Sequence, residues 1–234
     1  MKRWWLFACR LCLYMSNLKG LEQVVLSPKE SDEVYELLRD AYVPREPVCI
    51  GLRSSYDELK PLFESVIPHT LTNGISIGLK DSSSGKVVAV MLNVVIDSPD
   101  FQLFKNGELG SEKADLYSKL LQDFCAGVDV FNGSQFKKNL ELLLLCVHPN
   151  YGKRGIGAEL IKMSENKGRA MGCDIATIQA VNIITDHIVR KLGYQEVSKM
   201  DLSERRKENG EPLVDMELMR ANGTTHLTYL SKRL

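Results

Sequence analysis

Apolar residues along the chain recur at two spacings, and each spacing predicts a different kind of element. In residues 29–41 they recur at every third or fourth position, with Ser27 or Ser31 as the candidate N-cap, which predicts an amphipathic helix. Residues 140–147 form a nearly unbroken apolar run, typical of a strand buried on both faces. The same reasoning predicts helices at 56–66, 116–125, 156–171 and 183–192, and strands at 75–79, 87–96, 175–181, 194–197, 217–219 and 225–229.

The order of these elements defines the fold class. The centre of the chain is predicted to run strand, Gly-rich turn, helix, strand, helix, strand, which indicates a mixed α/β protein. Pro44 and Pro47 predict an irregular segment between the first two helices. No internal repeat or long linker interrupts residues 21–234, so we expect one domain there. Residues 1–20 are expected to be a dispensable N-terminal extension.

Composition and charge narrow the function classes. Hydrophobic residues make up 44% of the chain and charged residues 26%, which is ordinary for a soluble globular protein. Thirty Lys and Arg balance thirty Asp and Glu, so no bulk positive field is available and no nucleic-acid partner is expected. An apolar run at residues 4–14 is broken by Arg10 and is shorter than the roughly 20 residues that span a bilayer, so no stable membrane anchor is predicted.

The cysteines and histidines suggest neither a disulfide framework nor a metal centre. Six Cys are irregularly spaced along the chain, which favours free thiols in a reducing, cytoplasmic compartment. His and Cys nowhere approach the spacing of zinc ligands, so no metal site is predicted.

A Gly-rich turn joins the predicted strand at 140–147 to the helix that follows it. The first N–H groups of a helix lack intrahelical partners, and the helix dipole favours an anion there. Gly155 and Gly157 would let a phosphate approach the main chain, while Lys153 and Arg154 add positive charge. The turn therefore predicts a diphosphate site, although it has neither the Walker nor the dinucleotide spacing. Glycines that serve only tight packing are the alternative.

This stretch resembles motif A of the GNAT acyl-CoA N-acetyltransferase superfamily, in which Val-x-Pro precedes Gln/Arg-x-x-Gly-x-Gly/Ala. Val147, Pro149, Gly155 and Gly157 fall in register, whereas Gly152 stands at the Gln/Arg position. The resemblance implies a mixed central sheet flanked by helices, with splayed parallel strands that admit acetyl-CoA as co-substrate. It implies that the cofactor is held by Cys146, Val147, Lys153, Arg154, Gly155, Ile156, Gly157, Ala158 and Asn182.

A second resemblance lies upstream, at residues 37–47. Their sequence is similar to the early helix and acidic loop of the insect-type arylalkylamine (dopamine) N-acetyltransferases. In that group the loop Glu is the general base, which implies this role for Glu46. The alternative is a solvated loop carboxylate paired with Arg45. His148 is a second base candidate, at a variable position of motif A.

Two further proton-transfer residues of these families have poorer counterparts in this sequence. The insect-type enzymes carry Ser residues after the next strand, and these positions fall near Val181 and Thr185. Thr185 keeps a hydroxyl and is the second catalytic candidate, with a first-turn helix residue as the alternative. The Tyr that many GNAT enzymes use as general acid falls near Val189, so that role is predicted to be unfilled.

Together these resemblances imply an acetyl-CoA-dependent N-acetyltransferase. The expected acceptor is a small primary amine, foremost an arylalkylamine such as dopamine, tryptamine or serotonin. A GNAT enzyme for a polyamine, amino sugar or amino acid is one alternative. A catalytically decayed CoA-binding protein is another, which the departures at Gly152, Val181 and Val189 would fit. The chain is expected to act as a monomer or a homodimer.

Overall fold

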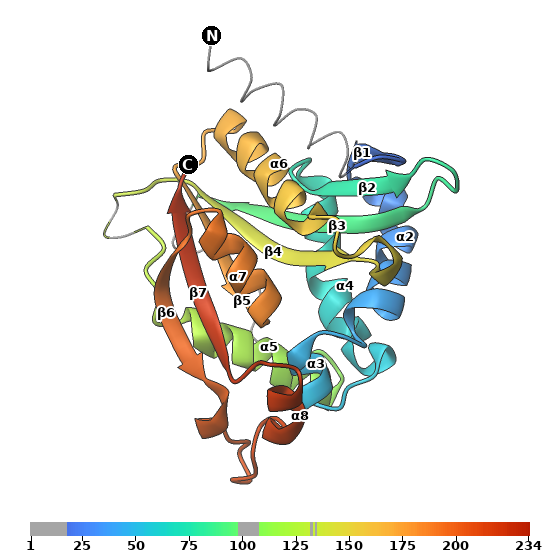
Figure 1. Ribbon diagram of the computed structural model, residues 1–234. Helices are drawn as coiled ribbons and strands as arrows, with labels where there is room; N and C mark the ends of the chain where they lie inside the picture. The colour runs from blue at the N-terminus through green and yellow to red at the C-terminus, as the bar shows by residue number, and fades with distance from the viewer. Residues whose placement is uncertain (1–17, 98–107, 132, 134) are drawn as a thin grey trace.

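The computed structural model describes residues 18–97, 108–131, 133 and 135–234, so most of the predicted N-terminal extension lies outside the described residues (Figure 1). The strands form one mixed seven-stranded sheet in the order β1-β2-β3-β4-β5-β7-β6. This confirms the predicted α/β class and a sheet flanked by helices. The strands are β1 (Leu21–Val25), β2 (Ile77–Asp81), β3 (Val87–Ile96), β4 (Asn139–Val147), β5 (Ile175–Ala180), β6 (Gln195–Asp201) and β7 (His226–Arg233).

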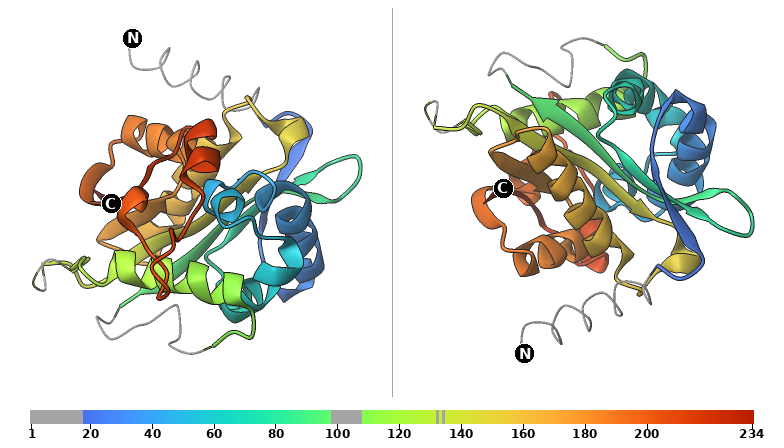
Figure 2. Two further views of the ribbon diagram at one scale, coloured as in Figure 1. Left: turned by 90° about the horizontal axis from the view of Figure 1, so that it is seen from below. Right: turned by 90° about the horizontal axis from the view of Figure 1, so that it is seen from above.

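Helices cover both faces of the sheet (Figures 1 and 2). One face carries α6 (Ile156–Ala170) and α7 (Ile183–Lys191), and the other carries α2 (Ser31–Leu37), α4 (Tyr56–Thr72) and α5 (Glu112–Cys125). The shorter elements are η1 (Pro28–Glu30), the π-helix η2 (Leu38–Tyr42), α3 (Pro47–Gly51), η3 (Pro149–Tyr151), η4 (Leu202–Glu204) and α8 (Met216–Ala221).

Strand β3 shows why the sequences of the central strands are apolar at nearly every position. Val90 and Leu92 pack into the core beneath α4 and α5, while Ala89 and Met91 pack into the core beneath α6. Successive strand residues point to opposite faces, so a strand covered on both sides needs apolar residues at every position.

The parallel pair β4–β5 separates part-way along its length. Pairing runs from Asn139 opposite Ile175 to Leu142 opposite Ile178, yet β4 continues to Val147. A register shift against β3 occurs at the same point, where Leu143 is the extra residue of a β-bulge. Beyond the bulge, β4 therefore has main-chain groups that β5 does not pair.

Two predictions of local structure are wrong, and strand β1 was not predicted. Residues 217–219, predicted as a strand, lie in helix α8, because Asp215 caps it by accepting hydrogen bonds from the N–H groups of Glu217 and Leu218 at 3.0 and 3.2 Å. Pro47 does not keep the chain irregular, because it takes the first position of α3, where no N–H is needed. The helix predicted at 29–41 is confirmed as a continuous helical run, which changes type from η1 through α2 to η2.

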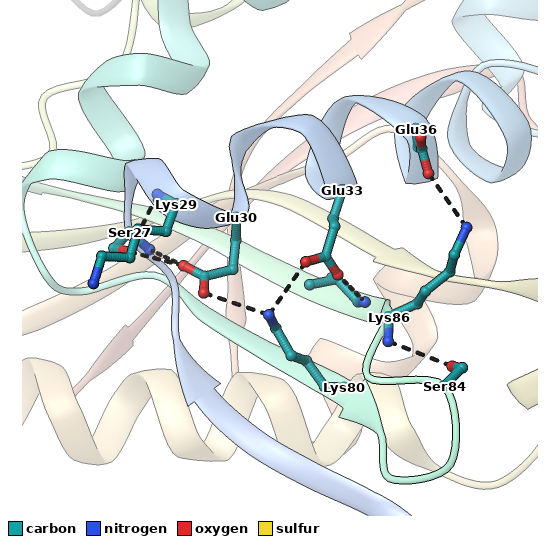
Figure 3. A network of polar contacts seen from close by, with 9 residues as sticks. Ser27, Lys29, Glu30, Glu33, Glu36, Lys80, Ser84 and Lys86 are labelled. Atoms are coloured by element: carbon teal, nitrogen blue, oxygen red, sulfur yellow. Dashed lines mark hydrogen bonds and ion pairs between the residues drawn. The ribbon is translucent and has the colours of Figure 1, made fainter.

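The helical segment η1–α2 is tied to the β2–β3 hairpin by a polar network (Figure 3). Ser27 and Glu30 form a capping box, as the Ser27 cap predicted. Lys80 on β2 reaches Glu30 at 3.4 Å and Glu33 at 3.2 Å. Glu33 also accepts a hydrogen bond from the N–H of Val87 at 2.6 Å. These contacts fix the start of the segment that leads into the candidate site.

Candidate active site

The loop between β4 and α6 presents main-chain N–H groups at the start of a helix. Gly155 is the N-cap of α6 and has a left-handed backbone, with φ +74°. Lys153 is also left-handed, with φ +61°. Because Gly155 has no side chain to cap the helix, the first N–H groups of α6, at Ile156, Gly157 and beyond, are left for an outside acceptor. The geometry fits a diphosphate.

The basic side chains of this loop point to different partners. Lys153 is exposed, whereas the Arg154 guanidinium donates a hydrogen bond to the carbonyl of Lys19 at 2.7 Å. Arg154 also lies 6.0 Å from the centroid of the Tyr151 ring. In this conformation Arg154 holds the segment before β1 against the loop, and Lys153 is the cation left free to face a phosphate.

The glycines of the loop differ in what they do. A Cβ at Gly152 would lie 3.1 Å from the carbonyl oxygen of Pro149, which gives a steric reason for Gly at the motif's Gln/Arg position. A Cβ at Gly157 would lie 3.3 Å from Leu145 Cδ2, so Gly157 also serves the close packing of α6 on β4. The side chain of Ile156, the first residue of α6, is buried, so only its main chain is available to a cofactor.

The end of β4 carries Cys146 and Val147, two of the residues predicted to hold the cofactor. Cys146 is buried, and burial raises the pKa of its thiol to about 12, so it stays protonated at neutral pH. The carbonyl of Val147 accepts a hydrogen bond from the Arg45 guanidinium at 2.7 Å. The Arg45 guanidinium also donates to the carbonyl of Ala41 at 2.6 Å. Arg45 therefore clamps the segment before α3 to the end of the splayed strand.

Glu46 is a buried carboxylate, 3% exposed, and not a solvated partner of Arg45. It is the N-cap of α3, where its Oε1 accepts from the N–H of Val48 at 3.0 Å and its Oε2 from that of Cys49 at 2.6 Å. Burial raises the pKa of Glu46, against hydrogen bonds from Cys49, Val48 and Tyr117 that lower it. A carboxylate with a raised pKa is suited to take up a proton near neutral pH.

Two tyrosines that sequence reasoning missed stand around Glu46. Tyr117, on α5, lies close enough to Glu46 for each group to shift the pKa of the other. Burial and the negative charge of Glu46 raise the pKa of both tyrosines well above the usual value. Tyr42 lies within the segment 37–47, so its position four residues before Glu46 was visible in the sequence. Tyr117 could not be found that way, because only tertiary packing places α5 there.

Asn182 and Thr185 form one helix cap at the start of α7. The side chain of Asn182 accepts a hydrogen bond from the N–H of Thr185 at 2.8 Å. This cap fixes Thr185 in the first turn of α7. Val181, the other position considered, packs against the hydrophobic core that contains Tyr117. His148 is half-buried and its Nδ1 accepts from the N–H of Asn150 at 3.3 Å, while His187 is exposed.

A second buried carboxylate, Glu141, lies on β4 just before the strands separate. One oxygen accepts hydrogen bonds from the Thr177 hydroxyl and, at 3.0 Å, from the Tyr229 hydroxyl. The other oxygen, Oε1, has no partner. Burial raises the pKa of Glu141. Among the described residues no group of three or more His, Cys, Asp or Glu could hold a metal ion, and no helix is long and apolar enough to cross a membrane.

Comparison with known proteins places this geometry in a family. Residues 116–194, from α5 to the end of α7, match the model of the Acetyltransferase (GNAT) family. The match and the helix-flanked sheet define the class of domain: residues 116–194 belong to a GNAT acetyltransferase domain. The predicted superfamily and fold are thus confirmed. No curated protein matches the sequence.

Solved structures share the fold over nearly the whole chain. Arylalkylamine N-acetyltransferase 2 from Aedes aegypti has a TM-score of 0.74 at 20% identity, covering 92% of this chain and 99% of its own. Mosquito arylalkylamine N-acetyltransferase like 5b has the same score and identity, with 92% and 100% covered. A Drosophila melanogaster polyamine N-acetyltransferase that forms N-acetylagmatine has a TM-score of 0.71 at 16% identity, with 92% and 100% covered. At these identities the likeness concerns the fold.

Proposed function

We propose that this protein transfers the acetyl group of acetyl-CoA to a small primary amine, and that the preferred acceptor is an arylalkylamine. The observation that carries the proposal is Glu46, a buried carboxylate with a raised pKa, set beside the splayed end of β4. The GNAT family uses acetyl-CoA as its acyl donor. An acceptor amine is protonated at neutral pH, so it needs a base before it can attack the thioester.

The cofactor is held by main-chain groups. The N–H groups that follow Gly155, at Ile156, Gly157 and Ala158, face the diphosphate, with Lys153 adding charge. The unpaired main chain of β4 near Cys146 and Val147 holds the pantetheine, and an N–H there polarises the thioester carbonyl as charge develops on its oxygen. Asn182 caps α7 at the far side of the opening between the strands.

Glu46 takes the proton of the ammonium, directly or through a water molecule. Its two oxygens offer about four acceptor positions, and the N–H groups of Val48 and Cys49 use two of them. Thr185, held by the Asn182 cap, offers a hydroxyl at the start of α7 for the same proton steps.

The surroundings of Glu46 favour an aromatic amine over a polyamine. Tyr42 lies one helical turn before Glu46, and its ring centroid is 6.2 Å from that of Phe63. The ring centroid of Tyr56 is 5.9 Å from that of Phe63, so an aryl group beside Tyr42 would have aromatic neighbours. Arg45, next to Glu46, is a cation and would repel the second ammonium of a polyamine. The solved relatives include both arylalkylamine and polyamine N-acetyltransferases, so the choice between the two acceptors rests on these local features.

The test is to incubate the full chain with acetyl-CoA and a panel of amines while following free thiol. We expect thiol release that depends on dopamine, tryptamine or serotonin and that exceeds release with agmatine or spermidine. Preference for agmatine would replace arylalkylamine with polyamine as the acceptor class. Binding of acetyl-CoA without thiol release for any amine would contradict the proposed activity and favour a decayed CoA-binding protein.

A further inference from the structure

A cavity of about 420 Å³ lies at the C-terminal end of α3, the opposite end of that helix from Glu46. Small-molecule sites commonly have volumes of roughly 300 to 1,000 Å³. The walls come from three separate parts of the chain, which are residues 51–53 at the end of α3, Lys113 in the first turn of α5, and residues 207 and 212–216 before and at the start of α8. Helices α3 and α8 lie side by side at this place (Figure 1).

The floor of the cavity is apolar and firmly held. Leu52, Leu213 and Val214 are buried, so their positions are fixed by the packing beneath them. A Cβ at Gly51 would lie 2.6 Å from Met219 Sδ, which shows that α3 already packs closely on α8. The hollow is therefore not a sign of loose packing between the two helices. The floor consists of Gly51, Leu52, Pro212, Leu213, Val214 and Met216.

The rim of the cavity is positively charged in a chain whose formal net charge is zero. Both oxygens of its one carboxylate, Asp215, are already occupied. The Arg53 guanidinium donates to Oδ2 at 2.6 Å, and the first N–H groups of α8 donate to Oδ1. The charged rim residues are three cations and one carboxylate, a net charge of +2: Arg53, Lys113, Lys207 and Asp215.

The two lysines of the rim are poorly paired. Lys113 Nζ donates to the carbonyl of Leu52 at 2.5 Å, and the described residues give it no ion pair. Lys207 Nζ lies 3.8 Å from Glu112 Oε1 and 4.0 Å from Glu211 Oε2, beyond hydrogen-bonding distance. The Lys207 side chain is only 25% exposed, so water screens its charge incompletely. Because an ammonium has three N–H donors, both lysines keep donors for an added anion.

The end of α3 does not oppose an anion here, although the carbonyls at a helix C-terminus normally do. The carbonyl of Gly51 accepts a hydrogen bond from the N–H of Asp215 at 2.7 Å. The carbonyl of Leu52 accepts from Lys113. The carbonyls nearest the cavity are thus bound, and the groups left over are N–H donors of cations.

Arg53 occupies a backbone position that usually belongs to glycine. It follows the C-cap Leu52 and is left-handed, with φ +52°. The N–H groups of Arg53 and Ser54 donate to the carbonyls of Ile50 and Cys49 at 2.9 and 3.0 Å, the Schellman pattern that ends a helix. A side chain at this position carries a conformational cost that glycine avoids. An arginine there favours a role for its guanidinium at the rim.

We propose that this cavity binds a small organic carboxylate with an apolar body, such as an arylacetate. The apolar body packs on the floor, and the carboxylate accepts charge-assisted hydrogen bonds from the cations of the rim. The same cations repel an ammonium, so the site selects against the amine acceptor of the proposed acetyl transfer. The inference concerns binding at the far end of α3 and does not rest on that reaction.

The experiment titrates the full chain by calorimetry with three probes. Phenylacetate has the charge and the apolar body, phenylacetamide has the same shape without the charge, and inorganic phosphate has the charge without the body. We expect saturable binding of phenylacetate, with dissociation constants at least about tenfold higher for the other two probes. No binding of phenylacetate up to about 10 mM, or equal affinity for any other probe, would overturn the proposal.

A pair of lysine variants locates the binding. Lys207→Met keeps the length of the side chain and removes its charge from the rim. Lys119→Met makes the same change on α5 outside the cavity, at an exposed lysine that lies 3.5 Å from Asp123. The affinity for phenylacetate should fall about tenfold in Lys207→Met and stay at the wild-type value in Lys119→Met. Equal affinities in the two variants would overturn the proposal.

A third variant, Arg53→Gly, guards against a damaged fold as the cause. Glycine suits the left-handed backbone at this position, so a loss of phenylacetate affinity there comes from the missing guanidinium. We expect such a loss, at unchanged affinity for acetyl-CoA. Wild-type affinity for phenylacetate in Arg53→Gly would overturn the proposal, because the arginine would then have no role at the rim.

Discussion

Carboxylates lie in two contrasting regions of this molecule, the surface network at α2 and the buried surroundings of Glu46 at α3. In the first, Glu30 has a pKa below its usual value, because hydrogen bonds from Ser27 and Lys80 outweigh a burial effect that raises it (Figure 3). In the second, burial of Glu46 outweighs the hydrogen bonds from Cys49, Val48 and Tyr117, and its pKa rises. Both carboxylates accept main-chain N–H groups at a helix start. Desolvation decides which of the two binds a proton more readily.

The difference separates structural from chemical roles. A carboxylate ionised well below neutral pH cannot accept a proton at working pH, so the Glu30 network serves to hold α2 on the β2–β3 hairpin. A buried carboxylate costs stability in its charged form, and proteins keep such groups mainly at sites of function. The second buried carboxylate, Glu141, belongs to the same class as Glu46. Changes at the buried carboxylates should therefore have larger effects than changes in the surface network.

The largest expected effect is that of Glu46→Gln on the rate. The acetylation rate at neutral pH should fall about 10²- to 10⁴-fold, because the proton acceptor is lost. The loss should shrink as pH rises, since more of the amine is then already deprotonated. Acetyl-CoA affinity should not change, because the loop at Gly155 is untouched. Initial rates from pH 6 to about 9 and a binding titration measure both quantities.

The matched control is Glu36→Gln, which removes an exposed carboxylate that lies 3.7 Å from Lys86. Its rate should equal that of the wild type. Because the Gln amide cannot accept from both Val48 and Cys49, Glu46→Gln should also lower stability by about 1 kcal/mol. Equal rates for Glu46→Gln and wild type across the whole pH range would reject Glu46 and return His148 or bulk water as the base.

The next effect concerns Gly155→Val. Acetyl-CoA at 100 times its dissociation constant should stabilise the wild type by about 2.7 kcal/mol, and the variant should lose most of this gain. The reason is a left-handed backbone at φ +74°, which a β-branched residue resists, and a Cβ that would meet the diphosphate. Thermal melts with and without acetyl-CoA measure the difference.

Gly85→Val is the control, since Gly85 has φ +70° in the β2–β3 turn and open space around its missing Cβ. Both variants should lose basal stability, but only Gly155→Val should lose the acetyl-CoA shift. A full shift retained in Gly155→Val would place the diphosphate elsewhere.

The sequence describes the local geometry of the candidate cofactor loop better than the surroundings of Glu46, for a physical reason. The strand, the glycine turn and the helix start of the loop all lie within residues 140–158, so their spacing in the sequence specifies the loop. The surroundings of Glu46 come from α3, α5 and β4, and residues such as Glu46 and Tyr117 approach each other only through tertiary packing. Residues 217–219 are a second example: the pattern of their side chains predicted a strand, but the N-cap Asp215 stabilises helix α8 there.

A smaller effect is expected from Glu141→Gln, and it should depend on pH. The folded pKa of Glu141 is raised, so its favourable contribution is present below the unfolded value of about 4.3 and is lost as pH rises through the folded pKa. Gln mimics the protonated form: its oxygen can accept from Thr177 and Tyr229 while its amide takes the place of Oε1. The variant should therefore gain stability relative to wild type as pH rises from about 5 to 9.

Glu30→Gln should behave in the opposite sense. The folded pKa of Glu30 is lowered, so its contribution is present above the unfolded value and is lost as pH falls through the folded pKa. Denaturant unfolding at several pH values would measure both slopes. Slopes of the same sign for Glu141→Gln and Glu30→Gln would remove the contrast between the two regions.

The smallest effect is expected at the surface, from Lys80→Met. Lys80 lies between Glu30 and Glu33 at 3.4 and 3.2 Å, and all three side chains keep contact with solvent. Such pairs contribute at most about 1 kcal/mol, and the loss should disappear in about 1 M salt, where the screening length falls to about 3 Å. Lys60→Met, which removes an exposed pair with Glu64 at 3.5 Å, is the control and should cost less still. A loss of more than about 2 kcal/mol in the free energy of unfolding, unchanged by salt, would contradict this. It would show that the charges of the network are as poorly screened by solvent as those of the buried carboxylates, and that burial does not distinguish the two regions.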